Sequence, residues 1–115
     1  MAKAMLQRGI STMSQQGLAL IDTGATSTAI DDQVAQHLKL PVVDKGAMVS
    51  ASHNNHPCNL YPVQFTLSGQ ISLEAPKAMG VNLAPQGFIA IIGRDVLRQC
   101  VMVYNGHTGS ISLSI

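Results

Sequence analysis

Asp22 is the acidic side chain whose position in the sequence most suggests chemistry. It follows the aliphatic run Leu18–Ile21 directly, and Thr23 and Gly24 come next. Burying an ionised carboxylate costs several kcal/mol, so strands seldom carry one into apolar surroundings. Thr23 offers a hydroxyl that can bond to nearby backbone, and Gly24 allows another main chain to approach closely. Asp22 is therefore either paired structurally or positioned for acid–base chemistry.

A second apolar run far downstream gives this acid a context. Phe88–Ile92 leads into Gly93, Arg94 and Asp95. Asp-Thr-Gly-Ala near the start of the chain, followed later by Ile-Ile-Gly-Arg-Asp, resembles one lobe of the retroviral-type (retropepsin-like) aspartic proteases, including their cellular and bacterial branch. The similarity spans roughly residues 18 to 103. It implies a mostly β fold, a single-lobe acid-protease β-barrel with a flap hairpin and one or two short helices.

The resemblance also implies a role for each residue of the two motifs. Asp22 would be the catalytic acid, and Thr23 and Gly24 would support the catalytic turn. Gly93 and Arg94 would be structural. The residues implied for substrate binding are Ala25, Thr26, Ser50, Ala51, Ser52 and Ile91. The resemblance implies no cofactor and no metal.

The chain departs from the viral pattern beside the acid turn. In the viral enzymes an acid that follows Asp-Thr-Gly-Ala pairs with the arginine of the Gly-Arg element. Here Thr26 and Ser27 occupy those positions, which leaves the partner of Arg94 open.

Peptide hydrolysis by carboxylates requires two of them, because one accepts a proton from water and the other donates a proton to the substrate carbonyl. This chain has a single Asp-Thr-Gly. Its other acids lie in polar or helix-start contexts and are Asp31, Asp32, Asp44, Glu74 and Asp95. A two-fold homodimer would place Asp22 opposite its own copy. The resemblance implies the same arrangement, with Thr23 bonding across the dyad and Ser110–Ile115 in a shared intersubunit sheet.

The leading hypothesis is therefore an aspartic endopeptidase, active as a homodimer on peptide or protein substrates. An alternative is a protease-like fold kept as a catalytically silent dimerisation or peptide-binding module. A third is a processing domain that acts mainly on its own polypeptide.

Composition narrows the class of protein. The 115 residues suffice for one domain, and 46% hydrophobic with only 11% charged residues is typical of a globular chain. Such low charge suggests that a partner covers part of the surface. A net charge of +1 gives no footprint for nucleic acid, and no apolar stretch is long enough to span a bilayer. Cys58 and Cys100 form neither a disulfide scaffold nor a metal motif, so we expect free thiols in a reducing, cytoplasmic compartment.

The elements that must position these residues follow from hydrophobic periodicity. We expect residues 1–17 to be a flexible start, with at most one edge strand, or the cut edge of a longer protein, and residues 18–115 to form the protease domain. Two extended arms, 46–52 and 58–67, surround the polar tip 53–57 and predict a hairpin at the place of the flap. His53 and His56 on that tip are interpreted as solvated residues, not metal ligands.

The remaining segments predict short strands and two short helices. Asp31 is expected to cap a helix over Asp31–Leu38, and Gly93 to open a second one. Pro76 is expected to end the strand that starts at Ile71. The other expected strands cover residues 18–21, 27–30, 88–92, 101–104 and 110–115.

Overall fold

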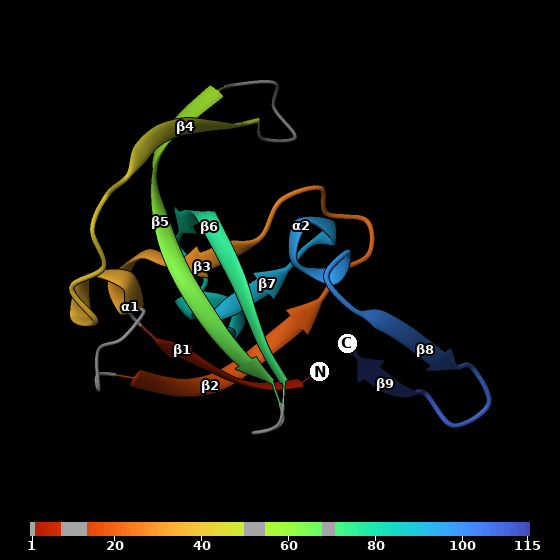
Figure 1. Ribbon diagram of the computed structural model, residues 1–115. Helices are drawn as coiled ribbons and strands as arrows, with labels where there is room; N and C mark the ends of the chain where they lie inside the picture. Colours follow the sequence, from red (N-terminus) through yellow and green to blue (C-terminus); the bar gives the residue numbers. More distant parts are fainter. Residues whose placement is uncertain (1, 8–13, 50–54, 68–70) are drawn as a thin grey trace.

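The computed structural model describes residues 2–7, 14–49, 55–67 and 71–115, and for residues 2–7, 47–49 and 55–56 it describes the backbone alone. Figure 1 shows the arrangement of the elements. They follow the chain in the order β1 (Ala2–Gln7), β2 (Ser14–Ile21), β3 (Ala29–Asp31), α1 (Asp32–His37), β4 (Asp44–Val49), β5 (Asn55–Leu67), β6 (Ile71–Val81), a 3₁₀ turn (Ala84–Gln86), β7 (Ala90–Ile92), α2 (Arg94–Leu97), β8 (Val101–Asn105) and β9 (Ser110–Ser114). The predicted mostly-β class is confirmed.

Seven strands form one sheet in the order β1-β2-β7-β3-β6-β5-β4, and β1 also pairs with β5. Six of them therefore form a ring of pairings, and β4 extends the sheet beyond it. β1 pairs with β2 from Ala2 to Gln7 and with β5 from Ala4 to Gln7. The segment in which we expected an edge strand at most thus contains a strand paired on both sides.

The core lies inside this ring and follows the period-two pattern of the strands. On β5 the side chains of Tyr61, Val63, Phe65 and Leu67 are buried, whereas those between them are partly exposed. This alternation is the one expected for a half-buried strand. Residues from β2, β3, β6, β7 and both helices complete the same cluster.

Helix α1 begins where the sequence predicts. Asp31 adopts an extended conformation and its carboxylate accepts a hydrogen bond from the backbone N–H of Val34, which makes it the N-cap. The same carboxylate accepts hydrogen bonds from the N–H groups of Leu83 and Ala84. Three backbone donors explain why Asp31 can be buried, with only 4% of its surface exposed.

Strand β6 continues through Pro76, so the prediction that this proline ends the strand is wrong. The pairing of β5 with β6 shifts register between Tyr61 and Val63, and Pro62 lies in the irregular step opposite Pro76. Both prolines lie where the ladder is already interrupted. The missing N–H groups therefore break no regular hydrogen bond, as is typical of proline at a β-bulge.

Strands β8 and β9 form a separate two-stranded sheet that projects from the body (Figure 1). Cys58 and Cys100 are free thiols. None of the helices in the described part of the chain is long and apolar enough to cross a membrane.

Candidate active site

Asp22 lies at the end of β2, where that strand runs parallel to β7. Ile21 pairs with Ile92, and the N–H of Asp22 donates to the carbonyl oxygen of Ile92 at 2.9 Å. The N–H of Gly24 donates to Oδ1 of Asp22 at 2.9 Å, and that of Ala25 donates to the Asp22 carbonyl at 3.1 Å. The chain thus turns sharply around a half-buried carboxylate. No described residue donates to the second carboxylate oxygen, which leaves it available to water or a substrate.

Gly93 brings the downstream motif against this turn. A Cβ atom at Gly93 would lie 2.7 Å from the carbonyl carbon of Ser27 and 3.0 Å from the carbonyl oxygen of Ala25. Only glycine allows the two backbones to approach this closely. The N–H of Arg94 then donates to the Ala25 carbonyl at 2.8 Å. The expectation that Gly93 is structural agrees with this packing.

The side chain of Arg94 reaches over the same turn. Its guanidinium donates to the Thr23 carbonyl at 3.1 Å and to the Thr26 hydroxyl at 3.0 Å. These two oxygens are the partners that the sequence left open. In the viral pattern an acid pairs with this arginine, whereas here two exposed neutral oxygens accept its hydrogen bonds.

A second hydrogen-bonded pair beneath the turn was missed by sequence reasoning. Thr28 is fully buried, and its hydroxyl donates to Oδ1 of Asp95 at 2.6 Å. The same hydroxyl accepts from the N–H of Gly93 at 3.0 Å, and the N–H of Thr28 donates to Oδ2 of Asp95 at 3.1 Å. Asp95 also accepts from the N–H of Val96 in the first turn of α2. Asp95 and the buried Thr28 therefore connect the segment after the Asp22 turn with the Gly93-Arg94-Asp95 motif.

The structure brings together some of the residues predicted to bind substrate. Ala25 is part of the turn, and Ile91 on β7 pairs with Leu20 on one side and Ala29 on the other. Thr26 is exposed, with its hydroxyl accepting from Arg94. Residues 50–52, which carry the predicted Ser50, Ala51 and Ser52, lie outside the described residues, as do His53 and Asn54. The predicted tip 53–57 is too long, because β5 begins at Asn55 and residues 55–57 already pair with β4.

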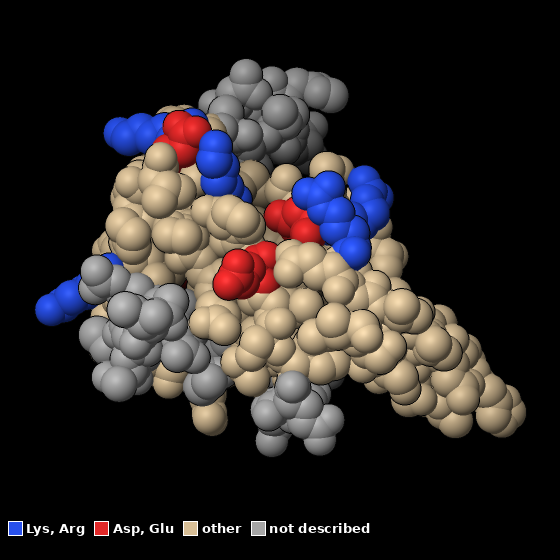
Figure 2. Space-filling view, viewed as in Figure 1, with Lys and Arg blue, Asp and Glu red and all other residues tan. Residues whose placement is uncertain are grey.

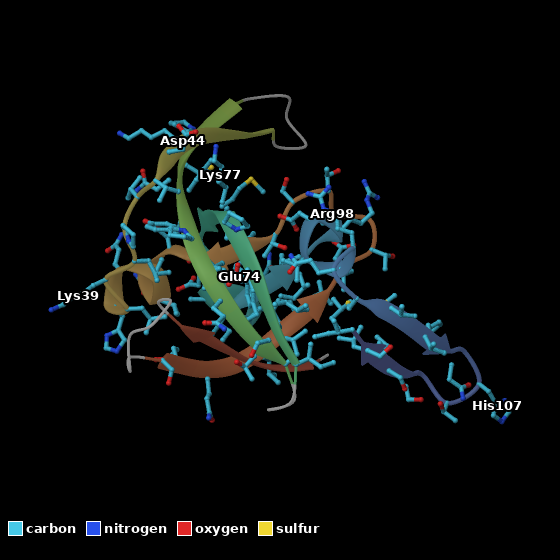
Figure 3. All side chains as sticks on the ribbon, in the orientation of Figure 1. Lys39, Asp44, Glu74, Lys77, Arg98 and His107 are labelled. Carbon is cyan, nitrogen blue, oxygen red and sulfur yellow. The ribbon has the colours of Figure 1, made fainter. Side chains whose placement is uncertain are left out.

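The other aspartates are engaged elsewhere. Asp31 and Asp95 accept backbone hydrogen bonds, Asp32 accepts from Tyr61 and Gln36, and Asp44 pairs with Lys77. Glu74 is exposed on β6 (Figure 3). No group of three or more histidine, cysteine, aspartate or glutamate side chains that could hold a metal ion occurs in the part of the chain that is described.

Comparison with known proteins agrees with this geometry. Residues 12–99 match the family described as gag-polyprotein putative aspartyl protease. No curated protein and no solved structure matches the chain. The matched span contains both motifs and every strand that positions Asp22, apart from β1. The chain belongs to this family of retroviral-type aspartyl proteases.

Proposed function

We propose that the protein is an aspartic endopeptidase that acts as a homodimer, with Asp22 of each subunit forming the catalytic pair. The observation that carries the proposal is the Asp22 turn. It presents one carboxylate with an oxygen bonded to Gly24 and the other oxygen unbonded by the described residues. The family match supports proteolysis as the chemistry.

The second carboxylate has to come from another molecule. Every other aspartate already has a backbone, tyrosine or lysine partner, and Glu74 lies exposed on β6 without the turn that Asp22 has. Two-fold symmetry is the simplest way to provide a second Asp22 in the same environment. Thr23 is exposed beside the acid, which suits its proposed role in bonding across the dyad.

The β8–β9 hairpin supports association with a second copy. Met102 pairs with Leu113, and both pack on the core, while the next pair on the same face, Tyr104 and Ile111, is 63% and 40% exposed. An apolar stripe thus runs from the core out along the projection. The hairpin has no charged residue, and Figure 2 shows it as an uninterrupted tan surface. We propose that the hairpins of two subunits join in the shared sheet predicted for Ser110–Ile115.

In the proposed reaction the two carboxyl groups hold one proton between them, as is established for aspartic proteases. The ionised Asp22 accepts a proton from water, which attacks the peptide carbonyl. The protonated Asp22 of the partner subunit donates its proton to the carbonyl oxygen, which gives a tetrahedral intermediate. The C–N bond of this intermediate then breaks as the first Asp22 passes the proton taken from water to the leaving amine, and a hydroxyl of the intermediate returns a proton to the partner subunit's Asp22. The hydrogen bond from the Gly24 N–H fixes the orientation of the Asp22 carboxyl group. The β4–β5 hairpin would cover the bound peptide, in the place of the flap.

The test is cleavage of an unfolded protein by purified Asp22→Asn and wild-type protein. We expect wild type to cleave and the variant to lose at least about 10³-fold in rate, since an amide can neither take nor give the proton. Glu74→Gln is the matched control, because it removes an exposed carboxylate outside the acid turn and should keep the wild-type rate. Equal cleavage by wild type and Asp22→Asn would refute the proposed mechanism.

The silent binding module remains the second candidate. The absence of an acid near Arg94, a departure from the viral pattern, is one reason to consider this candidate. That reason is weakened because the Thr23 carbonyl and the Thr26 hydroxyl accept hydrogen bonds from the Arg94 side chain. A statine-type transition-state mimic distinguishes the candidates. An active cleft should bind the mimic at least about 10²-fold more tightly than a plain peptide of the same sequence, whereas a silent cleft has no reason to prefer it.

A further inference from the structure

The base of the β4–β5 hairpin is held by a buried tyrosine that the proposed chemistry does not use. Tyr61 on β5 is only 2% exposed, and its hydroxyl donates to Oδ1 of Asp32 at 2.7 Å. Asn59 donates to the same hydroxyl at 3.3 Å, and Gln36 donates to the other oxygen of Asp32 at 2.8 Å. This cluster connects β5 with α1. Burial, reinforced by the Asp32 carboxylate, raises the pKa of Tyr61, so the phenol keeps the proton that it donates.

Strand β6 passes through this cluster at Gly80. A Cβ atom there would lie 2.5 Å from Oδ1 of Asp32 and 2.6 Å from Cε2 of Tyr61. The hydrogen bond between the tyrosine and the aspartate therefore crosses β6 through space that only a glycine leaves open. Tyr61, Asp32 and Gly80 form one contact made by three different elements.

Leu60 still pairs with Met79 of β6, and beyond Leu60 the described part of the hairpin has no further pairing with the body. A cavity of about 430 Å³ lies between them, lined by Lys45 and Pro57–Asn59 from the hairpin and by Asp32 and Gly80–Asn82 from the body. Packing therefore does not fill the space under the base of the hairpin. On the other side of Tyr61, the β5–β6 ladder is interrupted at Pro62, where a bulge lets a strand bend.

The other side-chain link between the hairpin and β6 in the described residues is weak. Lys77 and Asp44 pair at 3.3 Å, with 61% and 54% of the side chains exposed, and Figure 3 shows them together at the base of β4. The backbone N–H of Lys45 and then Lys77 lower the pKa of Asp44. Exposed pairs of this kind contribute little to stability, because water screens them.

We infer that Tyr61 is a positioning residue: its bond to Asp32 sets the angle at which the β4–β5 hairpin leaves the body, and the Pro62 bulge is the point about which that angle changes. If the hairpin covers the substrate, Tyr61 determines how well the cleft is formed without touching the reacting atoms. This last step rests on the proposed function, but the mechanical inference does not.

The test measures amide hydrogen exchange of the β4–β5 arms and of the body strands β2 and β7 in the full chain. Tyr61→Phe keeps the ring and removes only the hydroxyl. We expect exchange in residues 44–49 and 55–60 to become about tenfold faster, with less than a twofold change in β2 and β7, because a hydrogen bond to a charged acceptor is lost locally. Asp32→Ala should reproduce this pattern from the helix side, and it decides the question if Tyr61→Phe does not fold.

Two variants are matched controls. Asp32→Asn retains an oxygen that can accept from Tyr61 and should keep exchange within about threefold of wild type. Asp44→Asn removes the exposed pair on the same hairpin and should change it less than twofold. Unchanged exchange in Tyr61→Phe, equal acceleration in hairpin and body, or an equal effect of Asp44→Asn would each overturn the inference.

Kinetics provide the readout specific to positioning. With a peptide substrate, Tyr61→Phe should raise KM about fivefold and change kcat less than twofold, since substrate binding weakens while the acid pair is intact. The single variant Asp32→Asn should keep the wild-type KM. An unaltered KM in Tyr61→Phe would contradict the positioning role of Tyr61. If the wild-type protein cleaves nothing, the proposed function fails while hydrogen exchange still decides this inference.

Discussion

Replacing Thr28 by valine removes one hydroxyl from beneath the acid turn and leaves the side-chain shape nearly unchanged. Thr28 is fully buried, and because valine has nearly the same shape, the change leaves no cavity at this position. It does remove the acceptor of the Gly93 N–H and the donor to Asp95. The backbone bond from Thr28 to Oδ2 of Asp95 does not depend on the hydroxyl and should persist.

The expected cost follows from these two losses. A buried N–H left without a partner costs about 1–3 kcal/mol, and a hydrogen bond to a charged group contributes about 1.5–3 kcal/mol. Asp95 keeps the N–H groups of Thr28 and Val96, which reduces the second loss. We expect the free energy of unfolding to fall by about 3 kcal/mol. For a chain of 115 residues this corresponds to a Tm lower by roughly 10–15 °C.

Urea unfolding followed by circular dichroism, at one fixed protein concentration, measures this change. A fixed concentration is needed because any self-association would contribute to the apparent stability. Thr66→Val is the matched control: its hydroxyl lies 3.5 Å from that of Ser72 in an exposed pair, and the loss should stay within about 0.5 kcal/mol. A loss below about 1 kcal/mol for Thr28→Val, or equal losses for both variants, would refute the account of the buried pair.

Three further outcomes are expected. Arg94→Lys should destabilise by about 1 kcal/mol in urea unfolding, because an ammonium cannot serve both Thr23 and Thr26 with the fixed fork of a guanidinium; no change would mean that these exposed bonds are dispensable. Tyr104→Lys, which charges the apolar stripe of the hairpin at a residue 63% exposed, should weaken the proposed self-association at least about tenfold in sedimentation equilibrium, and an unaltered dimer would exclude this surface as the interface. Burial raises the pKa of the Cys100 thiol, so less of it is thiolate at pH 8 and alkylation by iodoacetamide should be slower than that of a cysteine peptide. The rate should also keep rising with pH after the rate of the peptide has reached its plateau. Equal rates and equal pH profiles would contradict the shift.

Local patterns in the sequence predicted much of the fold. The run Leu18–Ile21, the cap at Asp31 and the alternation of Val63, Phe65 and Leu67 each depend on neighbours within a few residues. The structure places β2, α1 and β5 over these segments. The Asp22 turn could be singled out because its apolar flank is local as well.

The missed contacts join residues that are distant in sequence. Nothing near Thr28 indicates Asp95, and nothing near Tyr61 indicates Asp32, because each bond depends on how the strands are ordered in the sheet. The same holds for Pro76, because a proline ends a strand only where the ladder requires a backbone N–H, and that depends on the register with β5. A threonine just before two apolar residues was the one available signal in the sequence, and it specifies neither burial nor a partner.

The parallel pairing of β2 with β7 has a consequence for how the protein is made. Ala19 and Ala90, and Asp22 and Ile92, meet only after most of the chain has been synthesised. Contacts between such distant residues form slowly, because the chain loses the entropy of closing a long loop before these contacts can stabilise it. An emerging polypeptide therefore carries Asp22 as an ordinary hydrated acid, and any reactivity of that acid is postponed until translation has passed Ile92.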